Sequence, residues 1–212
     1  KSEKAINYLL NAYSNMKSNI YRVFELANFL RNSEKYEKSI ELYSSILLKI
    51  KKEHELYPKV LDRRGIAYER IKNWELAEKD LINSLKISPN DPYVMNYLAY
   101  SWIERGENIN KALGMLRKAN NLKKNDGYIT DSLGWALYKL NNFLEAKKYL
   151  QLAIVLMPRD PIINDHFADC LWMNNKKIQA RYYWKYVLSL DSAEEELKEI
   201  INNKLLFGLE KT

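Results

Sequence analysis

The sequence predicts an all-α protein built as a row of helical hairpins, and three observations lead to this fold class. Glycine and proline are scarce, at 6 and 5 of 212 residues, while 47% of the residues are hydrophobic. That composition suits helices and disfavours a β-sandwich, which needs many turns. Small residues recur every 34 or 35 positions, and apolar residues between them follow helical spacing, which together indicate a solenoid of repeated units.

Two sets of small residues carry the repeat. The first set marks the first helix of successive units, at Gly65, Ala99, Gly134 and Ala168. The second set follows 12 or 13 residues later, at Ala77, Ala112, Ala146 and Ala180. We expect two antiparallel helices to approach each other closely at these positions, with large apolar residues filling the space around the contact.

The unit around Gly134 shows the hairpin most clearly. Leu133, Leu137 and Leu140 share one helical face, Asn141 and Asn142 form a polar turn, and a second apolar helix follows. Three units then close on a helix stop, in the segments "SPNDP", "KKNDG" and "MPRDP".

The segment "DSLGWALYKLNNFLEAKKYLQLAIVLMP" resembles the tetratricopeptide repeat (TPR), matching its small, aromatic and proline positions. The resemblance implies a right-handed superhelix of about five helix-turn-helix repeats with a C-terminal capping helix. The repeats are expected at residues 20–57, 58–91, 92–126, 127–160 and 161–194. The first has Ser39 where alanine is usual and a long polar connection over 51–57, and the third has one extra residue in its turn, "RGENINKA".

Both ends of the chain extend this pattern. Residues 1–19 resemble the second helix of a truncated repeat, through Ala5, Tyr8, Leu9 and Ala12. Residues 195–212 are expected to form the capping helix and a tail, and Ser192 with Glu195 has the spacing of a capping box. Since the chain starts at Lys1 and not at methionine, we expect it to be a fragment or a processed product.

At a finer level, "NDGYITDSLGWALYKL" and "PIINDHFADCLWMNNKKIQARYYW" resemble a group of envelope-type TPR proteins of α-proteobacteria. This resemblance implies a bacterial protein of the periplasm or envelope, and leaves the cytoplasm open. It implies no reaction.

Enzymatic and metal sites are not predicted. The single cysteine cannot form an internal disulfide, and His54 and His166 are too far apart for a zinc site of the usual spacing. His166 and Cys170 share a helix face with Asp165 and Asp169 nearby, but the TPR pattern places Cys170 at a tightly packed position, so we expect a buried, inert thiol. Phosphate-loop and hydrolase motifs are absent, and no cofactor is expected.

The resemblance places the first helix of each repeat on the concave surface, which is where a partner is expected. The positions that line it in this family form an acidic and aromatic groove here. These candidate partner-binding residues are Asp62, Tyr93, Asn96, Tyr100, Tyr128, Asp131, Trp135, Tyr138, Asp165, Asp169 and Trp172. Carboxylates and aromatic rings together favour a peptide or protein with basic residues.

Three alternatives stay open beside this interpretation. The aromatic residues could pack between neighbouring first helices, or the protein's own terminal helix could fill the groove. The lysine pairs at 51–52, 123–124, 147–148 and 176–177, within a net charge of +7, could bind RNA or membrane lipid on the outer surface. No specific nucleic acid partner is expected, because the concave positions are acidic.

Some TPR proteins clamp a C-terminal carboxylate with a Lys and an Asn four residues later on the first helix. This pair is missing here, because the corresponding positions hold Phe24/Asn28, Asp62/Ile66 and Asn96/Tyr100.

Overall fold

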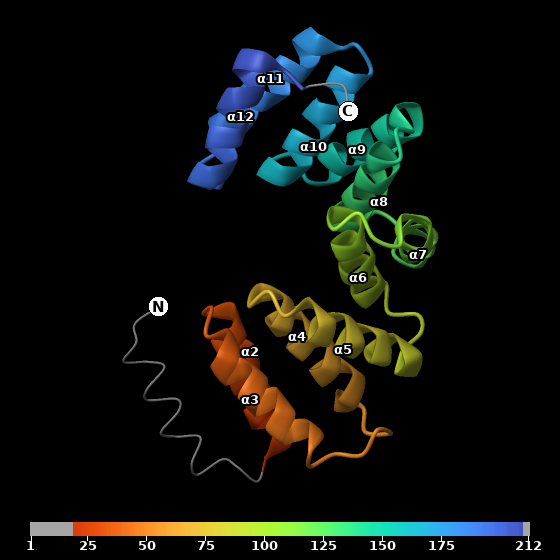
Figure 1. Cartoon of the computed structure of the whole chain (residues 1–212), viewed down its shortest axis with the longest axis vertical. Coiled ribbons are helices and arrows are strands. Elements are labelled where there is room, and N and C mark those ends of the chain that lie inside the picture. The colour runs from red at the N-terminus through yellow and green to blue at the C-terminus, as the bar shows by residue number, and fades with distance from the viewer. Residues whose placement is uncertain (1–18, 210–212) are drawn as a thin grey trace. The chain divides into compact units, whose positions relative to one another are not determined.

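The computed structural model describes residues 19–209, and all regular structure within them is helical (Figure 1). The predicted all-α fold is thereby confirmed. Ten helices pair into hairpins: α2 (Ile20–Asn32) with α3 (Tyr36–Leu47), α4 (Leu56–Arg70) with α5 (Trp74–Ile87), α6 (Pro92–Glu104) with α7 (Ile109–Leu122), α8 (Gly127–Lys139) with α9 (Phe143–Leu156), and α10 (Pro161–Met173) with α11 (Lys177–Leu188). A single helix, α12 (Glu195–Phe207), follows them. The proposed partial repeat over 1–19 lies outside the described residues, apart from Asn19.

The same turn joins the two helices of every hairpin. A backbone N–H beyond the turn donates to a carbonyl five residues earlier, as from Asn142 to Leu137 at 2.9 Å, and this bond recurs at 2.9 Å in all five hairpins. One turn residue in each has positive φ: Glu34, Lys72, Gly106, Asn141 or Asn175. This is a Schellman closure, which satisfies the last carbonyls of the first helix and fixes the exit direction of the chain. The third turn carries the predicted extra residue, with Asn108 also at positive φ.

Small residues hold the helices of each hairpin together, as the period predicts. Ala77, Ala112, Ala146 and Ala180 are fully buried on the second helices. On the first helices, Ala27, Ala99 and Ala168 are equally buried, and Gly65 and Gly134 take the same place. A Cβ atom on Gly134 would lie 2.6 Å from Leu150 Cγ, so this crossing tolerates no side chain without movement.

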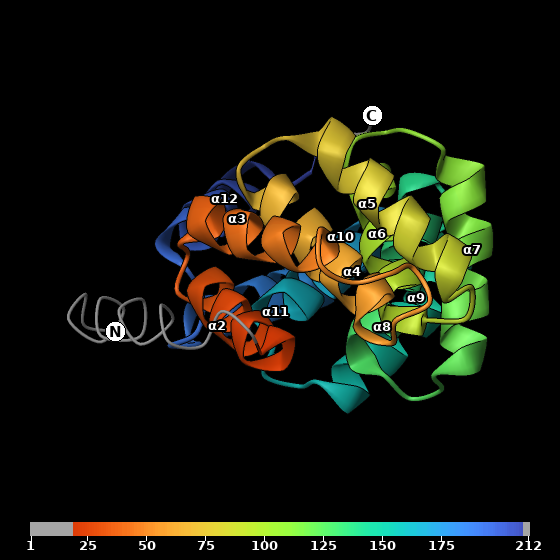
Figure 2. The same ribbon diagram turned by 90° about the horizontal axis from the view of Figure 1, so that it is seen from below.

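The chain divides into two compact units, with the boundary after Val94 inside α6. In the N-terminal unit α2 packs on α3, α3 on α4 and α4 on α5, and these four helices lie next to one another in Figure 2. Their core includes Val23, Leu30, Tyr43, Ile46 and Val60. In the C-terminal unit α7 to α12 pack in chain order, and α10 also contacts α8.

Two sequence expectations are wrong in detail. Ser192 does not cap the terminal helix, because α12 begins at Glu195 after the extended residue Glu194, and no side chain caps it. Glu195 and Glu196 instead place negative charge in the first turn, where it interacts favourably with the helix dipole. The polar connection predicted over 51–57 is shorter, since α4 already begins at Leu56, whose side chain is buried.

The crossing at Gly134 can be tested with a matched pair of substitutions. Gly134→Ala should lower the free energy of unfolding by about 1–3 kcal/mol, because the new methyl group overlaps Leu150. Gly114→Ala should raise it by about 0.5–1 kcal/mol, because a Cβ there meets nothing within 4 Å and alanine favours the helix. Urea unfolding of both variants checks this; equal shifts of the same sign would show that the helices around Gly134 are not closely packed.

Candidate functional site

A cavity of about 580 Å³ lies between α8, α10 and α12 of the C-terminal unit. Its walls combine aromatic, carboxylate and apolar side chains. Those that matter below are Trp135, Tyr138, Asp165, His166, Asp169, Leu197, Ile200, Lys204 and Leu209. Five of the nine were predicted or discussed as site candidates from the sequence, and the structure brings them together on one surface.

A stack of three rings forms the α8 side of the cavity. Trp135 lies 4.6 Å from Tyr138 on the same helix and 3.9 Å from His166 on α10, with interplanar angles of 5° and 10°. The indole N–H of Trp135 donates to Glu104 on α6 at 2.5 Å. Trp135 is therefore buried by its neighbours, and Tyr138 is the ring of the stack that remains half exposed.

His166 joins the two first helices through a charge-assisted contact. Its Nδ1–H donates to Asp131 Oδ2 at 2.9 Å, and both side chains are buried. Burial lowers the pKa of His166, but the charge and hydrogen bond of Asp131, with Asp165 and Asp169 nearby, outweigh it and leave the pKa above its ordinary value. Asp131 Oδ1 is buried and has no hydrogen-bond partner within residues 19–209.

Asp165 and Asp169 hold the terminal helix. Lys204 Nζ lies 2.8–2.9 Å from all four carboxylate oxygens of this pair, which are one turn apart on α10. Trp184 on α11 also donates its indole N–H to Asp169 Oδ1 at 3.0 Å. Burial, and then the charge of Asp165, raise the pKa of Asp169 to about 6 even though Lys204 lowers it.

Trp172 lies against the end of α12. Its indole N–H donates to the Leu209 carbonyl at 3.2 Å, and its ring leaves no space for a side chain at Gly208, where φ is +76°. Arg181 contributes by donating to the Leu205 carbonyl. Asp165, Asp169 and Trp172, predicted as partner-binding residues, are thus occupied by the protein's own terminal helix, the alternative that the sequence left open.

The aromatic candidates on α6 and at the start of α8 are more accessible. Tyr93 and Tyr128 are more than half exposed, whereas Asn96 and Tyr100 are half-buried. Burial, and to a lesser extent Glu104 and Asp131, raise the pKa of Tyr100. These residues lie on first helices, as the pattern predicts, with Tyr93 in the N-terminal unit and the others in the C-terminal unit.

The N-terminal unit contains the last candidate, Asp62, in a basic setting that the sequence analysis missed. Asp62 is buried and pairs with Arg63 at 3.1 Å. Arg31, Arg63 and Arg70 line a nearby cavity of about 540 Å³ with Ile66. Burial raises the pKa of Asp62 to about 6, although Arg63 lowers it. The other carboxylate candidates, Asp131, Asp165 and Asp169, all lie in the C-terminal unit.

The comparisons with known proteins point to one kind of repeat. No family model matches the chain. A curated relative, a TPR repeat-containing protein of Pseudomonas aeruginosa, is 27% identical over 135 residues, which cover 62% of this chain and 22% of the relative. The chain thus spans about a fifth of that relative's length.

Solved structures show the fold. A TPR protein of Thermus thermophilus matches with a TM-score of 0.71 and 16% identity, covering 89% of this chain and all of the other. A tetratricopeptide repeat protein of Parabacteroides merdae matches at 0.74 and 19%, covering 95% and 77%. The chain has the tetratricopeptide-repeat fold. YrrB, a TPR protein described as having an unusual peptide-binding site, matches at 0.62 and 14%, covering 92% and 97%.

Cys170 occupies a packed position of this TPR fold. It is fully buried, its Sγ lies 3.5 Å from the Phe143 carbonyl oxygen, and burial raises the pKa of the thiol to about 12. A thiol with such a pKa is a poor nucleophile. Over residues 19–209, no three His, Cys, Asp or Glu side chains are arranged to hold a metal ion. In the same range no helix has the length and hydropathy to span a bilayer.

Three functional contacts escaped the sequence analysis: His166 with Asp131, Lys204 with the carboxylate pair, and Trp184 with Asp169. The first two join residues 35 to 39 positions apart. The repeat period itself contained a signal for the first contact, because neighbouring first helices are about 35 residues apart. No periodic signal exists for Lys204, which lies in the non-repeated terminal helix.

The raised pKa of Asp62 predicts a pH-dependent stability. In the folded state the Asp62 carboxyl group keeps its proton up to about pH 6, whereas in the unfolded state it loses the proton near pH 3.8. The contribution of Asp62 to the free energy of unfolding therefore falls as the pH rises between those values. Asp62→Asn should therefore match the native chain near pH 4 and exceed it by roughly 2–3 kcal/mol above pH 6.

Urea unfolding of the native chain and the variant at four pH values from 4 to 7 measures this difference. Glu53→Gln, which removes an exposed carboxylate of the same unit, is the control and should show no such trend. An Asp62→Asn variant that is less stable than the native chain at pH 7 would mean that the Arg63 ion pair outweighs the cost of burial.

Proposed function

We propose that this TPR protein is a non-enzymatic adaptor whose C-terminal unit binds a peptide or partner protein with basic residues on its concave face. The observation that carries the proposal is the position of Lys204. Its ammonium group lies between two carboxylates beside a row of aromatic rings, which is an internal example of the recognition that we propose for a partner.

The accessible residues of this face divide into two roles. Tyr100, Tyr128 and Tyr138 offer ring area to a bound segment, and the half-buried Asn96, whose Oδ1 is buried, would offer its amide N–H group. Asp131 and Trp135 are buried and would act by orienting the half-buried ring of Tyr138 and by keeping the local field negative. We assign Tyr93, and Asp62 with its arginine neighbours, to a separate contact made by the N-terminal unit.

The negative field is only partly compensated. Glu104, Asp131, Asp165 and Asp169 lie near the ring stack, against Lys204, Lys139 and the titratable His166. Because the charges are enclosed by protein, their effect on a ligand cation is stronger than on an open surface. A lysine or arginine side chain of a partner would approach the half-exposed face of Tyr138 and gain about 0.5–2 kcal/mol from the ring.

The comparisons support a binding role in general terms: TPR folds serve as protein-interaction scaffolds, and the neighbour YrrB is described as having a peptide-binding site. By resemblance to envelope-type TPR proteins, we extend the proposal to an adaptor in the bacterial periplasm or envelope.

A second candidate function is the binding of RNA or membrane lipid by the outer lysines. It is favoured by the exposure of Lys51, Lys52, Lys123, Lys124, Lys148, Lys176 and Lys177. These lysines are spread over separate turns and helices, so they form no continuous strip, and we rank this function second.

Titration with labelled peptides separates the two functions. A fluorescein-labelled 12-residue peptide of alternating Leu and Lys should bind more tightly than its Leu–Glu counterpart. Tyr138→Ala and Tyr128→Ala should each weaken binding by at least fivefold, the range of an anchor residue, as measured by fluorescence anisotropy.

Tyr149→Ala removes a half-buried tyrosine from the second helix α9 and should leave the affinity within twofold. Preference for the Glu peptide, or a loss with Lys123→Glu/Lys124→Glu together with a steep fall of affinity with salt, would favour the anionic partner instead.

A further inference from the structure

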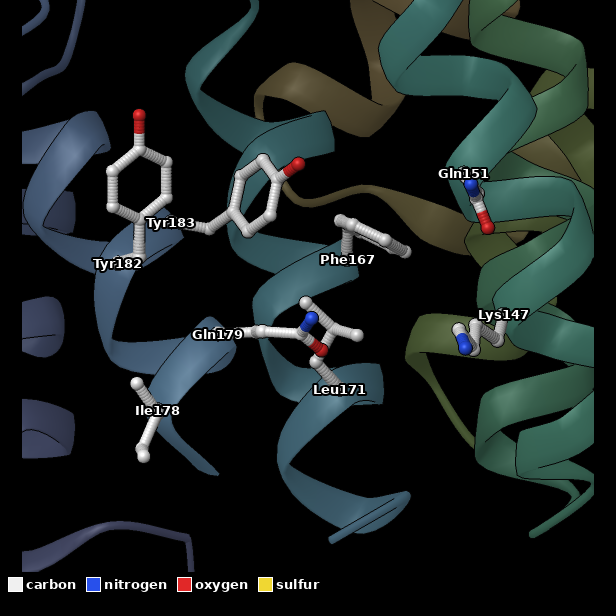
Figure 3. Close-up of a pocket in the computed structure, with 8 residues that line it drawn as sticks. All are labelled: Lys147, Gln151, Phe167, Leu171, Ile178, Gln179, Tyr182 and Tyr183. Carbon is white, nitrogen blue, oxygen red and sulfur yellow. The ribbon is translucent and has the colours of Figure 1, made fainter. Parts of the chain in front are cut away.

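A second cavity, of about 520 Å³, lies on the surface made by α9, α10 and α11 (Figure 3). Phe167 and Leu171 of α10 form its floor, and both are buried. Lys147 and Gln151 of α9 line one side, and side chains of α11, including Ile178 and Tyr182, line the other. The function proposed above uses none of these residues.

Exposed apolar side chains border this groove on both helices. Ile178 is 88% exposed and Tyr182, one turn later, is 68% exposed. On α9, Leu144 (77%) and Val155 (71%) lie seven residues before and four residues after Gln151, and so continue the same stripe. Single exposed apolar residues are ordinary, but a set gathered along two helices beside an apolar floor marks a docking surface.

The charges around the groove have one sign. No Asp or Glu occurs between Asp169 and Asp191, a stretch that contains all of α11. The only acidic residue of α9, Glu145, is paired with Arg117 at 2.7 Å. Lys147, Lys148 and Lys185 are thus left without a carboxylate partner within residues 19–209, and Lys185 follows Ile178 and Tyr182 on the same face.

We propose that this groove docks an acidic amphipathic helix of a partner protein. Apolar side chains at i, i+3 or i+4, and i+7 of such a helix would lie on Phe167, Leu171 and Ile178, and its flanking Asp and Glu residues would face the lysines. Because α9 has 14 residues and α11 has 12, the groove suits a partner helix of similar length, about 20 Å.

Other occupants fit the observations less well. A second copy of the chain, packed face to face, would place these lysines against one another, which is repulsive. A lipid surface would meet the protruding Ile178 and Tyr182 but leave the recessed Phe167 and Leu171 without contact. A nucleic acid duplex presents mainly phosphates and sugars on its outside, so it would leave that apolar floor without contact.

Fluorescence anisotropy with a designed probe tests the proposal. The probe is a fluorescein-labelled 14-residue helical peptide with Leu or Phe at i, i+3, i+4 and i+7 and Asp or Glu elsewhere, compared with the same peptide carrying Lys in place of Asp and Glu. The acidic peptide should bind at least tenfold more tightly. Ile178→Glu and Lys147→Glu/Lys148→Glu should each weaken its binding by at least tenfold.

Matched controls exist in the N-terminal unit. Leu48→Glu changes an apolar residue that is 89% exposed, nearly the same as Ile178, and Lys51→Glu/Lys52→Glu reverses two exposed lysines. Both should leave the affinity within twofold. Circular dichroism should show that all four variants stay folded, since each affected side chain is exposed or half-exposed.

Four results would overturn the proposal. The first is equal binding of the acidic and basic peptides, and the second is an equal loss of affinity in the groove variants and the control variants. The third is that the acidic peptide does not bind, while vesicles of phosphatidylcholine and phosphatidylserine (7:3) bind in a way that depends on Ile178. The fourth is a dimer in sedimentation velocity that Ile178→Glu abolishes.

Discussion

The C-terminal unit depends on the pairing of carboxylates that are withdrawn from water. Asp131, Asp165 and Asp169 are buried on the first helices α8 and α10, where an uncompensated charge would cost several kcal/mol. Each has a polar partner from another helix: His166 from α10 contacts Asp131, and Lys204 from α12 is shared by Asp165 and Asp169, with Trp184 from α11 also donating to Asp169. Beside the apolar contacts of the repeat, the His166–Asp131 contact links the first helices α8 and α10, and Lys204 links α10 to α12.

This arrangement also shapes the proposed binding surface. Since Lys204 pairs with both carboxylates of α10, the last hairpin holds the chain's own terminal helix, and the partner binding that we propose is left to the rings and charges around α8. His166 links both regions, because it contacts Asp131 by its Nδ1 atom and Trp135 by its ring face. A change in the charge of His166 would therefore alter its contact with Trp135, and through Trp135 the position of the half-exposed Tyr138 ring.

Much of the fold could be predicted because it follows from local pattern. The period of small residues located the close approach of two helices at Gly134 and Ala146. The extra residue in the turn of the third hairpin was also visible in the sequence. The site was less predictable. Family positions identified Asp131, Trp135 and Asp165 as inward-facing, but burial and pairing depend on neighbours in other helices. Lys204 lies in the helix that does not repeat, and Ser192 has capping-box spacing without capping the helix, because α12 begins three residues later.

The pairing of α12 with α10 is tested most directly by the free energy of unfolding of Lys204→Met. Urea unfolding followed by tryptophan fluorescence should show a loss of about 3–5 kcal/mol, because two buried carboxylates lose their partner. Lys198→Met, which breaks an exposed pair with Glu195 on the same helix, should cost less than about 1 kcal/mol. Adding Asp165→Asn and Asp169→Asn to Lys204→Met should restore most of the loss. A Lys204→Met variant as stable as Lys198→Met, or a triple variant less stable than Lys204→Met alone, would contradict the account.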